Sequence, residues 1–158
     1  MKITPFFTLI LTGLLMVMIV NIMPVYGNGD NNSPLIEALK ENRQLWRSQH
    51  LQNYEFIYEE QCFCLAPANT PLKVSIKDDK IIQVVNLTSN QEIKDLNFPK
   101  TIEQLFDIID EAIKGHADEI LVTYDSSLGY PNTVAIDYQK ILADEEVSYT
   151  VKNLIKLN

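Results

Sequence analysis

The two cysteines of this chain, Cys62 and Cys64, are separated by one residue and carry its most distinctive chemistry. Two neighbouring thiols could form a structural disulfide, exchange electrons as a thiol–disulfide pair, or bind a soft ion such as copper(I). On a regular strand their Cα atoms would be roughly 6.5–7 Å apart, near the upper limit for a disulfide, so a bridge requires a bulge or turn. The sequence favours a structural role and leaves the other two open.

The other polar side chains form no recognised catalytic or metal-binding motif. The only histidines, His50 and His116, are not spaced as zinc ligands with the cysteines, and the acidic residues Asp125, Asp137 and 144–146 lack the alternating pattern of an EF-hand. We find no nucleophile elbow, zinc-protease helix, phosphate-binding loop or dinucleotide-binding glycine set. The sequence therefore predicts no catalytic residue, no metal site and no cofactor. A hydrolase would need the fold to gather a histidine, a carboxylate and a nucleophile.

Aromatic residues and one turn provide candidate binding groups. Tyr54, Phe56 and Tyr58 alternate along a predicted strand and share one face, which indicates core packing or a recognition surface. The turn at residues 125–131 fits a hairpin connection, or a loop that faces a ligand. The candidate binding surface therefore consists of Tyr54, Phe56, Tyr58, Asp125, Gly129, Tyr130 and Pro131.

Residues 1–27 have the pattern of an export signal. Lys2 provides a positive start, residues 6–20 are almost wholly apolar, and residues 25–27 offer small side chains at a possible cleavage point. Because the apolar stretch continues to Met23, it could also remain as an uncleaved anchor. We expect a secreted, periplasmic or cell-envelope-associated protein that contacts membrane only through residues 1–27, if these stay attached.

The composition fits one exported domain, residues 28–158. The chain has 158 residues, of which 46% are hydrophobic, enough for one packed core. Its 21 acidic and 13 basic residues give a formal charge of -8, which argues against a nucleic-acid partner.

Hydrophobic periodicity predicts an α+β fold. Apolar residues at helical spacing predict helices at 33–48, with Ser33 as the N-cap, and at 102–113, where Thr101 and Gln104 match a capping box and Gly115 can end the helix. Alternating residues predict strands near 54–59, 73–77, 81–85, 120–124, 133–138 and 147–151. The expected architecture has two helices on one face of a mainly antiparallel curved sheet, in the order α-β-β-β-α-β-β-β.

Several of these motifs occur together in a known family. They are Leu45-Trp46, Tyr54-x-Phe56-x-Tyr58, Cys62-x-Cys64, Val74-x-Ile76, Thr101-Ile102-x-x-Leu105-Phe106, and Val122-x-Tyr124-Asp125 followed by Gly129-Tyr130-Pro131. In this order, over about residues 45–155, the chain resembles the small exported bacterial proteins catalogued as domain of unknown function 6174. The resemblance implies export and a bacterial source, and it assigns no activity and no catalytic residue. Members look secreted or lipid-anchored, and this chain lacks a lipidation cysteine.

The sequence as a whole predicts an exported domain that acts as a non-catalytic binding or cell-envelope-associated module. Its partner would be an unidentified protein or small ligand. The alternative is a thiol–disulfide or copper-handling protein that uses Cys62 and Cys64.

Overall fold

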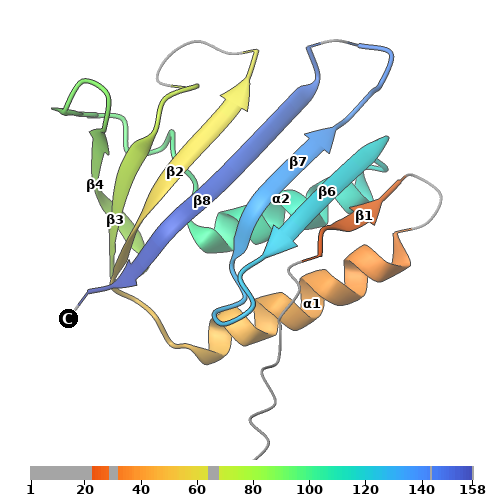
Figure 1. Ribbon diagram of the computed structural model, residues 1–158, viewed down its shortest axis with the longest axis horizontal. Helices are drawn as coiled ribbons and strands as arrows, with labels where there is room; N and C mark the ends of the chain where they lie inside the picture. The colour runs from red at the N-terminus through yellow and green to blue at the C-terminus, as the bar shows by residue number, and fades with distance from the viewer. Residues whose placement is uncertain (1–22, 29–31, 64–67, 143, 158) are drawn as a thin grey trace, which may run out of the picture.

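The computed structural model describes residues 23–28, 32–63, 68–142 and 144–157 (Figure 1). One sheet of eight antiparallel strands has the order β1-β6-β7-β8-β2-β3-β4-β5. The helices are α1 (Ser33–Ser48) and α2 (Ile102–Lys114), and the strands are β1 (Val25–Gly27), β2 (Tyr54–Cys62), β3 (Leu72–Lys77), β4 (Lys80–Asn86), β5 (Gln91–Glu92), β6 (Glu119–Tyr124), β7 (Pro131–Asp137) and β8 (Glu146–Lys156).

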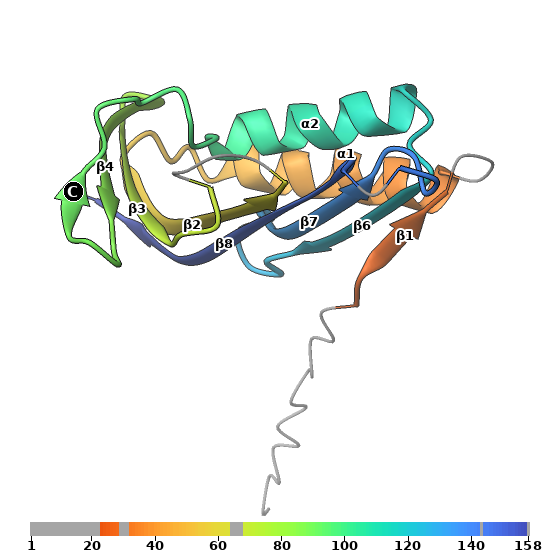
Figure 2. The same cartoon turned by 90° about the horizontal axis from the view of Figure 1, so that it is seen from above.

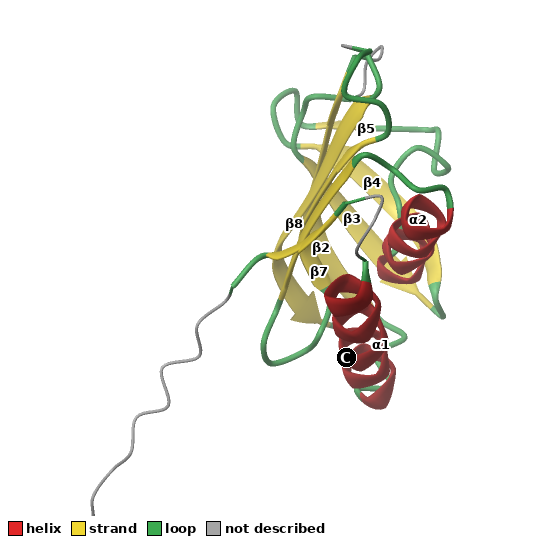
Figure 3. Ribbon diagram, turned by 90° about the vertical axis from the view of Figure 1, so that its right-hand side faces the viewer, coloured by secondary structure: helices red, strands yellow, loops and turns green. Residues whose placement is uncertain are grey.

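The predicted fold class is confirmed. Both helices lie on the same face of the sheet (Figures 2 and 3), and every predicted helix and strand is present. Two short strands were not predicted. β1 lies inside the segment that reads as an export signal, and β5 consists of two exposed residues without apolar alternation.

The helix ends follow the local sequence with one correction. Thr101 and Gln104 form the predicted capping box, in which the Gln104 N–H donates to Thr101 Oγ1 at 3.2 Å and the Thr101 N–H donates to Gln104 Oε1 at 2.8 Å. Ser33 is not the N-cap of α1. It is the first helical residue, and Asn32 precedes it without a capping side-chain hydrogen bond.

The strand order joins the two halves of the chain. The C-terminal strand β8 lies in the middle of the sheet, between β7 and β2. The β2–β8 register shifts between Glu55 and Ile57, and Asn153 of β8 adopts a positive φ of 51° there. A β-bulge of this kind lets the ladder continue, and β8 runs to Lys156.

The core lies between the sheet and the helices. Alternate strand residues point into it, and the apolar stripe of α2 covers them, with Leu105, Phe106 and Ile109 fully buried. The opposite sheet face carries the intervening residues, and no helix of the described chain covers it (Figure 3). Neither helix is long and apolar enough to cross a membrane, as judged from the described residues.

Candidate functional site

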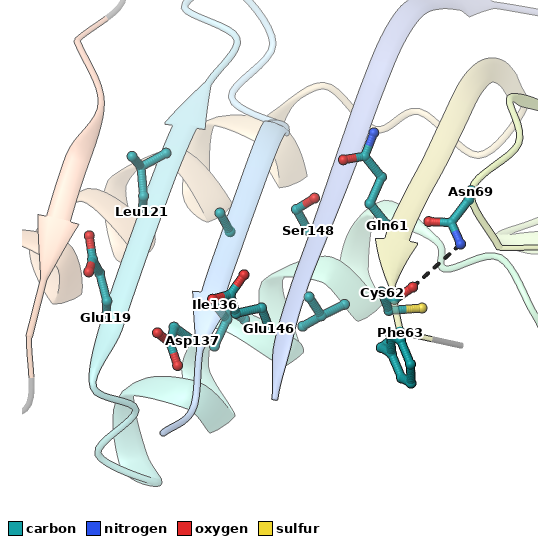
Figure 4. Close-up of a pocket in the computed structure, with 12 residues that line it drawn as sticks. Gln61, Cys62, Phe63, Asn69, Glu119, Leu121, Ile136, Asp137, Glu146 and Ser148 are labelled. Atoms are coloured by element: carbon teal, nitrogen blue, oxygen red, sulfur yellow. Dashed lines mark hydrogen bonds between the residues drawn. The ribbon is translucent and has the colours of Figure 1, made fainter. Parts of the chain in front are cut away.

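A groove of about 580 Å³ opens on the uncovered face of the sheet (Figure 4). Four strands contribute to it: β6, β7, β8 and the C-terminal end of β2. Its lining includes the small or polar side chains of Gln61, Ala135 and Ser148, together with Leu121. Phe63, just after β2, lies at the margin with its side chain 85% exposed. The groove therefore combines a floor of mixed polar and apolar side chains with an exposed aromatic ring.

Three carboxylates line one end of the groove. Glu119 of β6 pairs in register with Asp137 of β7, which pairs with Glu146 of β8. Like charges directly opposite each other on neighbouring strands are destabilising. Glu119 forms an ion pair with Lys140, whose Nζ lies 3.2 Å from Glu119 Oε2. We call Glu119, Asp137 and Glu146 the acidic row.

The acidic row does not have the geometry of a metal centre. Among the described residues, no three His, Cys, Asp or Glu side chains are placed to hold a metal ion. Asp137 Oδ1 is buried and has no hydrogen-bond partner in the described chain. None of the described residues that line the groove is basic. Because Lys140 pairs with only one of the three carboxylates, the row gives this end of the groove a net negative charge.

Cys62 is the last residue of β2 and borders the groove. The regular strand ends at Cys62. A disulfide with Cys64 would need the chain to leave the extended conformation at this point. Asn69 Nδ2 donates to the Cys62 carbonyl oxygen at 3.4 Å. Cys62 is not a free thiol. Cys64 lies outside the described residues, and neither histidine lines the groove.

The predicted tyrosine row is part of the core. Tyr54, Phe56 and Tyr58 are 3%, 1% and 0% exposed, so they offer almost no surface to a partner. Alternation directs them toward the helices, on the face opposite the groove floor. Burial raises the pKa of Tyr54 and Tyr58 well above the usual range, so both phenols are neutral at physiological pH. These side chains pack the core, one of the two alternatives considered for them.

The hydroxyls of the two tyrosines bind the segment that leads into α2. The Tyr54 oxygen has a hydrogen bond with the backbone of Ile102, and the Tyr58 oxygen has one with the backbone of Lys100. Each lowers the pKa of its phenol, so the backbone N–H is the donor. Tyr58 also donates to Glu60 Oε2 at 2.6 Å. The tyrosines thus position the start of α2.

The turn at residues 125–131 packs against α1. Asp125 Oδ1 accepts hydrogen bonds from the N–H groups of Ser127 at 3.0 Å and Leu128 at 2.8 Å. Tyr130 is 7% exposed and meets the Trp46 ring edge-on at 6.3 Å. Pro131 is buried at the start of β7. None of Asp125, Gly129, Tyr130 and Pro131 lines the groove, and their contacts are those of a packed hairpin.

A second hollow, of about 450 Å³, surrounds His50 between the end of α1 and the start of α2. It gathers His50 with Asp79 and Glu103, as a hydrolase would require, and with the hydroxyls of Tyr54 and Thr101. Both hydroxyls are already engaged, Tyr54 by the Ile102 backbone and Thr101 by the Gln104 N–H. His116 lies at the far end of α2 and does not line this hollow. The hollow therefore gathers residue types that a hydrolase would use, with both hydroxyl oxygens held by backbone N–H groups.

A family model matches residues 38–156 and describes a family of unknown function, DUF6174. The chain belongs to this family. A comparison with curated proteins and one with solved structures gave no match. The DUF6174 match extends from α1 to β8 and includes every residue of the acidic row.

The groove of this DUF6174 protein was not predicted. The sequence offers Asp137 and Glu146 only as calcium candidates, and Glu119 stands directly before a predicted strand. The signal was therefore weak. What unites the three is the register of β6, β7 and β8, which one sequence does not reveal.

Proposed function

We propose that this DUF6174 protein is an exported, non-catalytic binding module, and that its groove takes a positively charged segment of an envelope or extracellular protein. The acidic row carries the proposal. Three carboxylates in cross-strand register impose a repulsive cost on folding that a cationic side chain would relieve. Such a cost is retained where it serves binding.

The shape of the site supports a peptide segment as the partner. The groove crosses four neighbouring strands and is open, so it can accept an extended chain without rearrangement. The exposed ring of Phe63 offers apolar contact beside the negative end. An aromatic group next to carboxylates suits lysine and arginine. Their apolar stems can pack against the ring while their charged groups pair with the carboxylates.

A bridge between Cys62 and Cys64 would serve this module as a structural clip. The chain has two cysteines, and no cysteine in the described ranges is a free thiol, which supports the pairing. Oxidation is expected of thiols outside the cytoplasm. The clip would hold Phe63 at the margin of the groove. Among the described residues, no group of three His, Cys, Asp or Glu side chains is placed to hold a metal ion.

The binding proposal is tested with a fluorescein-labelled peptide of alternating lysine and glycine. We expect Asp137→Asn combined with Glu146→Gln to weaken binding roughly tenfold, measured by fluorescence anisotropy at low salt, because two charges leave the site. The matched control is Glu37→Gln with Glu41→Gln, which removes the same charge from exposed positions of α1. Equal weakening by both pairs, or none by the groove pair, would reject the groove as the site.

The thiol alternative is tested by intact mass and by Cys62→Ser combined with Cys64→Ser. We expect no mass gain on alkylation without a reductant, and two alkyl groups after reduction. We also expect the double variant to lose stability and keep peptide binding. A variant that folds with unchanged stability but loses copper binding or thiol-exchange activity would support the redox or copper alternative instead.

A further inference from the structure

β1 completes the sheet beside β6 (Figures 1 and 2). Its three residues pair antiparallel with β6, in the register Val25 with Val122, Tyr26 with Leu121 and Gly27 with Ile120. Ile120 and Val122 are fully buried side chains of the core. β1 therefore covers the backbone edge of a strand that belongs to the centre of the domain.

α1 packs directly onto β1. Gly27 is buried, and a Cβ atom there would lie 2.4 Å from Asn32 Oδ1 and 2.7 Å from Leu35 Cδ2. A larger residue fits only if the side chains of Asn32 and Leu35 move away. Leu35 is itself fully buried, and Val25 packs against the same core. The fit shows that β1 is an integral part of the fold.

The sequence places its export cleavage signals within this strand or after it. Signal peptidases require small residues at the first and third positions before the cut. Around the end of the apolar segment, the triplets that satisfy this are Val25-Tyr26-Gly27 and Gly27-Asn28-Gly29. No triplet with small residues at both positions occurs between residues 6 and 24. Cleavage at either site would remove β1 and leave the edge of β6 unpaired.

We propose that residues 1–23 are retained as a membrane anchor and that the folded domain begins at Pro24. This inference rests on the proposed export. Loss of β1 would expose a long unpaired edge, which promotes strand-to-strand association. Retention leaves one residue, Pro24, between the apolar segment and the sheet, so the N-terminal end of β1 would lie at the lipid surface.

Exposed side chains beside this junction fit a lipid surface. Met23 is 72% exposed and Tyr26 is 57% exposed, both within four residues of the apolar segment. Tyrosine is enriched at membrane interfaces, where its ring meets the headgroups. Met23 and Tyr26 are the only large apolar side chains described in residues 23–28 that are strongly exposed.

The full-length protein, expressed in a bacterial host, tests the anchor. We expect it in the membrane fraction after a carbonate wash, with the intact mass of the complete chain, and degraded by protease added outside the inner membrane. A mature N-terminus at Asn28 or Asp30 would overturn the inference. Resistance to external protease in intact spheroplasts would overturn export itself, which separates the two failures.

Engineered cleavage gives a positive control. Ile22→Ala with Pro24→Ala creates an Ala-Met-Ala triplet ahead of β1, and we expect it to release a soluble domain that begins at Val25. Pro24→Ala alone leaves Ile22 in place and should stay membrane-bound. Release of the native chain to the same extent as the double variant would contradict the anchor.

The role of β1 in the sheet has its own test. In the full-length protein, Gly27→Val should displace β1 and speed hydrogen exchange of the 119–124 amides at least about tenfold. Tyr26→Val is the control, because Tyr26 is exposed and valine suits a strand. Unchanged exchange in Gly27→Val would show that β1 is dispensable and remove the basis for its retention.

Discussion

The hydroxyls of Tyr54 and Tyr58 explain why tyrosine, rather than phenylalanine, stands at two core positions of β2. Each ring fills the core, while its oxygen reaches a backbone N–H in the segment that begins α2. Ile102 is the first residue of that helix, and its N–H has no intrahelical acceptor. The Tyr54 oxygen supplies one. Of the two alternatives that the sequence left open for this motif, core packing holds, and the two hydroxyls add polar contacts inside the core.

We expect Tyr54→Phe to lower the free energy of unfolding by about 1–2 kcal/mol, because the Ile102 N–H loses its partner in a buried setting. Urea denaturation measures the loss. Tyr124→Phe is a matched control, since the Tyr124 hydroxyl is buried without a hydrogen-bond partner in the described chain, and its removal should change stability by less than about 0.5 kcal/mol. Equal effects of the two substitutions would disprove the role of the Tyr54 hydroxyl.

Gly129 is required by both backbone and packing. Its φ is +81°, and a Cβ atom there would lie 2.5 Å from the Asn42 carbonyl oxygen of α1. We expect Gly129→Ala to cost about 2–4 kcal/mol in urea denaturation, because strain and collision add. Asn90→Ala is the comparison, since Asn90 has a φ of 55° on an exposed turn and should show the backbone strain alone. If Gly129→Ala lowered the free energy of unfolding no more than Asn90→Ala does, α1 would have to move enough to accommodate the new methyl group.

At the scale of elements, local pattern was sufficient for both helices and six of the strands. The capping box at Thr101 and the alternation from Tyr54 depend only on residues close in sequence, so both could be predicted correctly without knowledge of the tertiary structure. β1 was not predicted because its three residues lie within the segment that was interpreted as an export signal. The bulge at Asn153, which extends β8, depends on the pairing with β2 and has no local signal.

The site was harder to predict than the fold for a similar reason. The acidic row draws on residues 119, 137 and 146, and only the register of three strands makes them neighbours. The aromatic residues Tyr54, Phe56 and Tyr58, which the sequence left open as core or binding surface, are buried. The sequence predicts only which face of the sheet the helices cover, not their contacts residue by residue. Chemistry that lies within one motif, as in Cys62 and Cys64, was visible from the sequence.

Ion pairs join the two helices on their exposed sides. Arg43 Nη2 of α1 lies 2.8 Å from Glu103 Oε2 and 2.6 Å from Asp107 Oδ1 of α2, and Arg47 Nη2 lies 3.0 Å from Glu103 Oε2. Burial alone would raise the pKa of Glu103. Hydrogen bonds from Arg47 and Arg43 outweigh this effect and hold the pKa below the usual value. Glu103 is therefore the shared acceptor of the contact between the helices.

The lowered pKa gives stability a pH dependence. A carboxyl group with a depressed folded pKa stabilises the protein above its unfolded pKa, near 4.5, and this contribution is lost as the pH falls through the folded value. Glu103→Gln should flatten the loss of stability between about pH 5 and pH 3, by less than about 1 kcal/mol because the group is partly exposed. Glu37→Gln, on the exposed side of α1, is the control. An identical pH profile for both variants would exclude the contribution of Glu103.

At the scale of the whole molecule, the strand order interleaves the two halves of the chain. β8, from the second half, pairs with β2, from the first, and a single core runs beneath both helices. Trp46 lies at the junction, with its ring 5.3 Å from that of Tyr54 and 6.3 Å from that of Tyr130. One residue of α1 thus contacts a strand of the first half and the turn before β7 in the second.

This arrangement predicts one cooperative unfolding transition. Trp46 is the only tryptophan and is 5% exposed, so its fluorescence reports the junction, while far-UV circular dichroism reports all helices and strands. We expect the two urea curves to coincide, because neither half can open without breaking the β2–β8 ladder. Tyr54→Phe and Gly129→Ala, one in each half, should shift both curves to lower urea by equal amounts within each variant. Separation of the fluorescence and dichroism midpoints, in the native chain or in either variant, would show that the halves unfold independently and that the central ladder does not unite them.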